Sequence, residues 1–178
     1  MDDRTWAARL ALAAGHGDQV AAAALIRTTQ EQVWRFVAHL VGPDEADGLT
    51  RETYLRAVRR PPAFTADSSV HTWLLMTARR VVADQHRTAT AGPPPARRDE
   101  RQADTEDTVA LRRLLDRLAP ERREAFVVTQ VLGLSYAEAA QILDCAVDTV
   151  RSRVARARDD LVSATADADA SRSGRRSG

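Results

Sequence analysis

The residues with the clearest chemical potential are four arginines close together near the C-terminal end of the chain. They are Arg151, Arg153, Arg156 and Arg158. On a helix over residues 148–161, apolar positions recur at helical spacing and form one stripe that must pack on other helices. The positions of this stripe are Val150, Val154, Ala157 and Leu161. The opposite face is then cationic, with small residues between the arginines. Because arginine can donate two hydrogen bonds to a guanine edge or pair with phosphate, this face suits a DNA major groove.

The segment before this helix predicts the partner of a helix-turn-helix. Ser135 and Glu138 form an S-x-x-E capping box, and residues 139–143 supply small and apolar groups for a tight helix crossing. Asp144 falls where the turn often needs a positive φ, which aspartate tolerates better than most residues. We interpret Asp148 as the cap of the second helix and Cys145 as a small buried group. The alternative is a solvated arginine face on an ordinary helical hairpin.

Composition limits the possible functions. The 178-residue chain has a net charge of +1 and no lysine, so DNA binding must rest on a local patch rather than on overall charge. A single cysteine excludes an intramolecular disulfide. No apolar run reaches the length of a membrane span, and the acidic N-terminus lacks a secretion-signal pattern. We therefore expect a cytoplasmic protein without membrane insertion.

The pattern of apolar and breaker residues predicts an all-α chain of two small helical domains joined by a flexible linker. Residues 89–107 contain three consecutive prolines and few apolar groups, which favours a linker. Residues 163–178 are expected to be a disordered tail. The two domains are then residues 1–88 and 108–162, and neither shows strand-like alternation.

Breaker and capping residues divide each domain into about four helices. In the first domain, Gly42-Pro43 ends one helix and Ser68 or Ser69 caps another. The helices predicted there cover about residues 5–14, 20–41, 44–60 and 69–87. In the second domain they cover about residues 109–118, 120–133, 135–143 and 148–161.

Three stretches of sequence together resemble a known family. They are "DEADGLTRETYLRAV", "FTADSSVHTWLLMTARRVVADQHR" and "LAPERREAFVVTQVLGLSYAEAAQILDCAVDTVRSRVARARDDL". In this order and separation they resemble the bacterial sigma factors of the extracytoplasmic-function (ECF) group, in the sigma-70 family, especially the actinobacterial kind. The resemblance covers about residues 20–161, apart from the linker.

The resemblance implies a transcription initiation factor with core RNA polymerase and promoter DNA as partners, and an anti-sigma factor as a further candidate. Residues 1–88 would be region 2, which binds the −10 element and polymerase, and residues 108–162 would be region 4, which binds the −35 element. The implied −35 readers are Thr149, Arg151, Ser152, Arg153 and Arg156. The implied −10 readers are Phe64, Thr65, Asp67, Ser68, Ser69, Arg79, Arg80, Asp84 and Arg87. The implied polymerase contacts are Asp47, Leu49, Arg51, Glu52 and Arg56.

An apolar stripe in the first domain gives further detail, and four positions depart from the family pattern. On the helix over 69–87 an inner apolar stripe passes beside Trp73, which we interpret as core packing. In the family, glycine is usual at the positions of Asp144 and Asp148, proline is common at Ala146, and glutamine is common at Arg51. None of these differences removes the fold, but a carboxylate at position 148 would repel phosphate.

Two other classes of function were weighed. A stand-alone helix-turn-helix regulator would bind duplex operator DNA without polymerase, but no dimerisation helix is evident. An enzyme is not expected, because the four histidines are scattered and there is no H-E-x-x-H, phosphate-binding glycine loop or nucleophile motif. We expect no metal and no cofactor. The histidines are His16, His39, His71 and His86.

Overall fold

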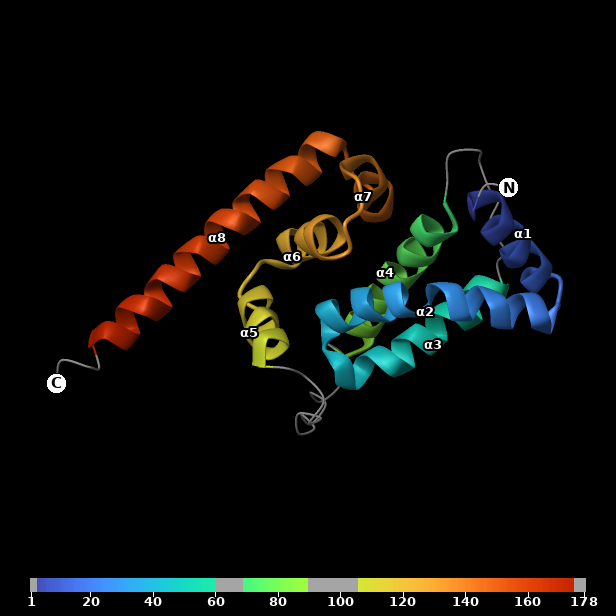
Figure 1. Ribbon diagram of the computed structural model, residues 1–178, viewed down its shortest axis with the longest axis horizontal. Helices are drawn as coiled ribbons and strands as arrows, with labels where there is room; N and C mark the ends of the chain where they lie inside the picture. Colours follow the sequence, from blue (N-terminus) through green and yellow to red (C-terminus); the bar gives the residue numbers. More distant parts are fainter. Residues whose placement is uncertain (1–2, 60–68, 90–105, 175–178) are drawn as a thin grey trace. The chain divides into compact units, whose positions relative to one another are not determined.

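The computed structural model describes residues 3–59, 69–89 and 106–174 (Figure 1). Within these ranges every regular element is helical and there is no strand, which confirms the all-α prediction. The backbone divides into two compact units, Met1–Asp99 and Glu100–Gly178. Most of the segment predicted to be a linker lies outside the described residues.

The described residues of the first unit form four helices at nearly the positions predicted from the sequence. They are α1 (Asp3–Gly15), α2 (Gln19–Val41), α3 (Pro43–Arg59) and α4 (Val70–Ala89). Helix α2 contacts each of the other three helices, and α3 also packs on α4. Helix α2 is therefore the centre of this unit (Figure 1).

Local signals explain where these helices begin and end. The carboxylate of Asp18 accepts hydrogen bonds from the backbone N–H groups of the first turn of α2. Gly42 ends α2 at φ 93°, a conformation that glycine adopts without steric cost. Ser69 caps α4, because its hydroxyl accepts a hydrogen bond from the backbone N–H of Thr72 at 3.0 Å. Ser68, the other candidate cap, lies outside the described residues.

The core of the first unit is apolar with one internal polar pair. Phe36, Leu74 and Leu75 are completely buried where α2 and α4 pack. The hydroxyl groups of Thr29 and Tyr54 lie 2.7 Å apart and share a hydrogen bond. Burial raises the pKa of Tyr54 to about 12, because an apolar environment disfavours the phenolate. The phenol is therefore neutral under ordinary conditions, and it ties α3 to α2.

The second unit contains α5 (Glu106–Leu115), α6 (Pro120–Phe126), a π-helical turn η1 (Val127–Val131), α7 (Tyr136–Leu143) and α8 (Val147–Gly174). Helices α6 and α7 both pack on α8. The centre of the core is formed by residues that are fully or almost fully buried. They are Leu115, Ala125, Val127, Val128, Ala139, Ile142, Val150, Val154 and Ala157.

Three helices of the second unit differ in extent from the sequence expectations. Helix α5 begins and ends three residues earlier than expected. The predicted helix over 120–133 is interrupted, because the chain changes to π-type hydrogen bonding at Val127 while it buries Val127 and Val128. Helix α8 continues to Gly174, so the tail expected to be disordered is helical over most of its length. Ala164 is buried and α5 contacts α8, so this extension still packs on the unit.

Candidate nucleic-acid interface

Helices α7 and α8 form the helix-turn-helix that the sequence predicts. The hydroxyl of Ser135 accepts a hydrogen bond from the N–H of Glu138, and the Glu138 carboxylate accepts one from the N–H of Ser135 at 3.0 Å. Asp144 ends α7 at φ 52° and ψ 53°, in the left-handed region. Both local predictions are confirmed: the capping box sets the start of α7, and the left-handed residue Asp144 ends it before the turn to α8.

One stripe of α8 is buried and holds the helix against the unit. Val150, Val154 and Ala157 are each at most 1% exposed, as their helical spacing predicts. Leu161 is half-buried, and the stripe continues to the buried Ala164. Because this side is packed against α6 and α7, the opposite side of α8 must face away from the core.

The outward side of α8 carries short polar residues and one arginine without an internal hydrogen bond or ion pair among the described residues. Ser152, Ala155 and Arg156 are exposed, and Thr149 is half-buried. Within the described part of the chain, Arg156 has no hydrogen-bond or ion-pair partner. Its guanidinium can therefore move to a base edge or a phosphate without breaking an internal contact.

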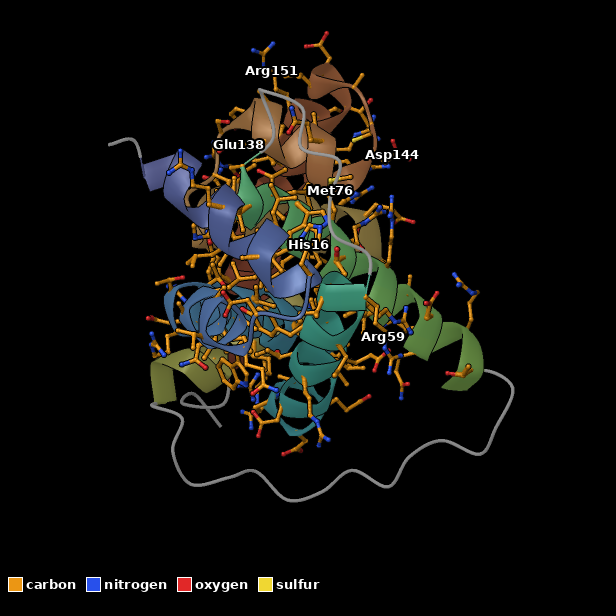
Figure 2. All side chains as sticks on the ribbon, turned by 90° about the vertical axis from the view of Figure 1, so that its right-hand side faces the viewer. His16, Arg59, Met76, Glu138, Asp144 and Arg151 are labelled. Carbon is orange, nitrogen blue, oxygen red and sulfur yellow. The ribbon has the colours of Figure 1, made fainter. Side chains whose placement is uncertain are left out.

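The three arginines that flank Arg156 at positions 151, 153 and 158 each have an internal contact. Arg151 Nη1 lies 3.0 Å from an oxygen of Asp148, and its guanidinium lies 6.0 Å from the centre of the Tyr136 ring. Figure 2 shows Arg151 at the outer edge of this unit. Asp148 is the second residue of α8 and pairs with Arg151, so the interpretation of Asp148 as the helix cap is wrong.

The remaining two arginines are held by weaker, neutral partners. Arg153 Nη1 donates to the sulfur of Cys145 at 3.6 Å, and both residues are half-buried. Cys145 is thus a contact of the recognition helix rather than a fully buried group. Arg158 Nη2 donates to Gln130 Oε1 at 2.6 Å, across to the π-helical turn. Neutral partners leave the positive charge of both arginines uncompensated, so the face keeps an electrostatic attraction for DNA.

Other arginines of this unit stabilise the packing of its helices rather than contribute to the outward face of α8. Arg122 Nη1 lies 2.6 Å from Asp160, which ties α6 to α8. Arg123 pairs with Asp116 at 3.1 Å and also donates to the backbone oxygen of Leu115. The sequence analysis missed these pairs, and it also missed Tyr136 and Gln130, because the partners are separated along the chain or lie on different elements.

In the first unit, two residues implied to read DNA meet two residues implied to bind polymerase. The carboxylate of Asp84 on α4 accepts hydrogen bonds from Arg87 and, across to α3, from Arg56. Arg56 also donates to Glu52 at 2.8 Å. The hydrogen bond from Arg56 is the main cause that lowers the pKa of Asp84, and the bond to Glu52 is the main cause that raises the pKa of Arg56.

This network lines a cavity of about 460 Å³ that also contains Trp73 and Arg80. Arg80 is exposed and Trp73 is half-buried. Trp73 therefore offers part of its ring to the cavity, and the interpretation of Trp73 as core packing is only half right. Arg79 is half-buried on the same helix. The remaining −10 candidates lie outside the described residues; they are Phe64, Thr65, Asp67 and Ser68.

The residues implied to contact polymerase are divided between two surfaces of α3. Asp47 and Arg51 are exposed and line a mainly apolar groove of about 790 Å³ between α2 and α3. Trp34 of α2 donates its indole N–H to Asp47 at 2.8 Å. Leu49 is half-buried, and Glu52 and Arg56 belong to the network with Asp84. Sequence reasoning missed the contribution of Trp34, because it considered α3 alone.

The described residues contain neither a helix that could span a membrane nor a cluster of side chains that could bind a metal. In residues 3–59, 69–89 and 106–174 no helix has the length and apolar character needed to cross a membrane. Over the same ranges no three histidine, cysteine, aspartate or glutamate side chains converge in a way that could hold a metal ion.

Comparison with known proteins decides the family. Residues 25–91 match the family described as "Sigma-70 region 2" and residues 108–161 match "Sigma-70, region 4". "ECF RNA polymerase sigma factor SigC" of Mycobacterium tuberculosis is 48% identical over 162 residues, which cover 86% of this chain and 88% of the relative. The chain belongs to the ECF sigma factors. A "Probable RNA polymerase sigma-C factor" of Mycobacterium bovis is similar to the same extent.

Solved structures of related proteins share the fold of this ECF sigma factor. The structure of sigma factor RpoE in complex with the anti-sigma factor NepR, from Bartonella quintana, has a TM-score of 0.67 and 26% identity, and the match covers 76% of this chain and 91% of that one. CnrH in complex with the cytosolic domain of CnrY has a TM-score of 0.72 and 25% identity over 92% of this chain and 99% of that one.

Proposed function

We propose that this ECF sigma factor brings core RNA polymerase to its promoters by reading two DNA elements with two separate units. The outward face of α8 reads the −35 element as duplex DNA, through Thr149, Arg151, Ser152, Arg153 and Arg156. The observation that carries this assignment is the exposed Arg156, which has no partner among the described residues and lies among small side chains on a helix whose other side is buried. An α-helix with such a face fits the major groove.

The −10 element is assigned to the first unit. Arg79, Arg80, Asp84 and Arg87 on α4 act there with Ser69 and with Phe64, Thr65, Asp67 and Ser68 of the preceding segment. The half-buried Trp73 beside Arg80 in the cavity supports this assignment, because an aromatic ring and arginines together can stack a base and hold its phosphate. The segment 89–107 links this reading surface to the second unit.

Polymerase binding is assigned to α3, through Asp47, Leu49, Arg51, Glu52 and Arg56. The groove between α2 and α3, with Trp34 at its side, supports a protein contact there. An anti-sigma factor is proposed as a further partner, because the related RpoE is solved in complex with one. The chain is proposed to act in the cytoplasm and to carry no catalytic residue of its own.

Run-off transcription with purified core polymerase, with and without this protein, tests the proposal. We expect promoter-specific transcripts only when both are present. The free protein should bind promoter DNA weakly, because joining two modules on polymerase raises their combined affinity by roughly 10²- to 10⁴-fold. Tight, sequence-specific duplex binding by the isolated chain, with no effect on core polymerase, would support the stand-alone regulator instead.

A further inference from the structure

Asp148 stands in a place where a carboxylate is not expected. It is in the first turn of α8, and the N-terminal residues of a recognition helix are those that contact base edges. Its side chain is 89% exposed, so it is not held there by packing. A carboxylate at a DNA surface repels phosphate. Its presence in the reading helix therefore needs a role that offsets this repulsion.

Fold stability does not supply that role. The Asp148–Arg151 pair is an i, i+3 contact between two exposed side chains, 89% and 64% exposed. Ion pairs of this kind contribute little to stability, because water and salt screen them. What the pair does fix is the direction of a long, flexible side chain that would otherwise sample many rotamers.

Arg151 is held from two sides. Its Nη1 lies 3.0 Å from Asp148 Oδ1, and Tyr136, at the start of α7, has its ring centre 6.0 Å from the guanidinium carbon. Within the described chain, Nε and Nη2 of Arg151 have no partner. These two nitrogens form one edge of the planar guanidinium with parallel N–H groups, which is the fork that a guanine accepts at O6 and N7.

The other arginines of α8 are not prepared in this way. Arg156 has no contact within the described residues that would fix its direction, and Arg153 is directed onto the sulfur of Cys145. Among the four arginines at 151–158, Arg151 is thus the one whose position is set by an acidic neighbour on the same helix, while its two-donor edge has no partner among the described residues.

We propose that Asp148 is a positioning residue that sets the base specificity of Arg151, and that Arg151 so held reads a guanine in the −35 element. The inference rests on the proposed function of α8 as the −35 reader. Asp148 orients the guanidinium before DNA arrives, so less side-chain freedom is lost on binding a guanine. The same carboxylate repels phosphate. It therefore also disfavours positions of α8 on the DNA in which Arg151 would contact the DNA backbone.

A double-mutant cycle in the holoenzyme tests this. Transcription by core polymerase with wild-type protein, Asp148→Ala, Arg151→Ala and the double variant is measured on every single-base substitution of the −35 element. Arg151→Ala should reduce discrimination at one guanine position by roughly 5- to 150-fold. Asp148→Ala should reduce discrimination at the same position by at least about threefold and have no further effect in the Arg151→Ala background.

Two further variants keep the test specific. Asp148→Asn keeps an acceptor oxygen and should retain part of the discrimination. Asp159→Ala removes one exposed carboxylate from the same helix and should leave the base preference unchanged. Because positions 148, 151 and 159 are all exposed, the variants should fold, and circular dichroism checks this.

Each of the other possible results contradicts the inference and points to a different role for Asp148 or for α8. If Asp148→Ala strengthens transcription equally on all −35 variants, the carboxylate acts by repulsion alone. If its loss of discrimination persists in the Arg151→Ala background, Asp148 contacts a base itself. If Arg156→Ala changes the base preference while Arg151→Ala does not, α8 still reads DNA and only the inference fails. If Asp148→Ala, Arg151→Ala and Arg156→Ala all leave the base preference unchanged, the proposed role of α8 as the −35 reader fails as well.

Discussion

The two surfaces proposed to bind DNA differ in the partners of their arginines. On α4, the carboxylate of Asp84 binds both Arg87 and Arg56, so positive charge is neutralised within the first unit. On α8, Arg153 and Arg158 contact a thiol and an amide, and Arg156 has no partner among the described residues. On the α8 face only Arg151, among the four arginines at 151–158, has an acidic partner within the described part of the chain, whereas on α4 the guanidinium of Arg87 is ion-paired and would have to exchange that pair to bind phosphate.

This difference fits the two tasks proposed for the surfaces. The −35 element is read as a rigid duplex, so a preformed helix face can dock without rearrangement. At the −10 element the duplex has to open, and Asp84 and Arg87, which are proposed to read it, share a network with Glu52 and Arg56, which are proposed to bind polymerase. Polymerase binding at α3 can thus influence which arginines of α4 are available to DNA. Under the proposed function, the second unit would dock on its DNA element without rearrangement, and the first would link DNA binding to polymerase binding.

The strongest way to break the comparison is to remove the support of the α8 face. Val154 is 1% exposed, and Val154→Asp would bury a carboxylate without a partner, at a cost of about 3–5 kcal/mol. We expect the second unit to unfold while the first keeps its helices, measured by thermal melting followed with circular dichroism. Ala155→Asp is the matched control, because its side chain is exposed; it should change stability by at most about 0.5 kcal/mol. Equal destabilisation by both would contradict the orientation of α8.

The next largest effect concerns the free arginine of the α8 face. If Arg156 contacts a base, Arg156→Ala should cost about 1–3 kcal/mol on the cognate −35 element and reduce the difference from altered elements. If it contacts only phosphate, all sequences should weaken alike and the salt slope should fall by about one. Arg158→Ala should show at most the second pattern, since Gln130 holds its guanidinium. Holoenzyme binding to −35 variants at several salt concentrations distinguishes these outcomes.

A smaller effect is expected from a substitution in the first unit, and it tests the same comparison. Asp84→Asn removes the carboxylate that Arg56 and Arg87 share, and it should release both cations toward DNA. We expect promoter binding by holoenzyme to become more salt-dependent, with a slope steeper by about one to two. Asp159→Asn on α8 is the control for the loss of one charge. An unchanged slope would mean that Arg56 and Arg87 do not reach phosphate even when freed.

The smallest expected effect is a pH dependence of stability that comes from Asp84 in the first unit. The hydrogen bond from Arg56 lowers the pKa of Asp84 below its ordinary value of 3.8. The stability that this group contributes is therefore fully present above that value and is lost as pH falls through the lower, folded-state pKa. Unfolding followed with urea in this acid range should show a weaker pH dependence in Asp84→Asn than in the wild type. Identical profiles would show that water screens the pair completely.

Much of the second unit could be predicted from the sequence, because its signals are local. A capping box needs two residues three positions apart, and a left-handed turn residue needs only its own backbone. The stripe of Val150, Val154 and Ala157 follows from helical spacing alone. For the same reason Gly42 and Pro43 predicted the end of α2, while α3 begins at Pro43, one residue before the expected start. The boundaries of α5 and the π-helical turn were missed, since tertiary packing decides which residues of an apolar run are buried.

The sequence by itself determined that the chain is helical, that it contains a helix-turn-helix, and which face of α8 turns away from the core, because all three follow from periodicity and capping along one segment. Only the tertiary structure decided which arginines are free. Arg56 meets Asp84 and Arg122 meets Asp160 across different helices, and Gln130 reaches Arg158 from the π-helical turn. The state of a charged side chain depends on partners that folding brings near, and neither composition nor spacing encodes their distance.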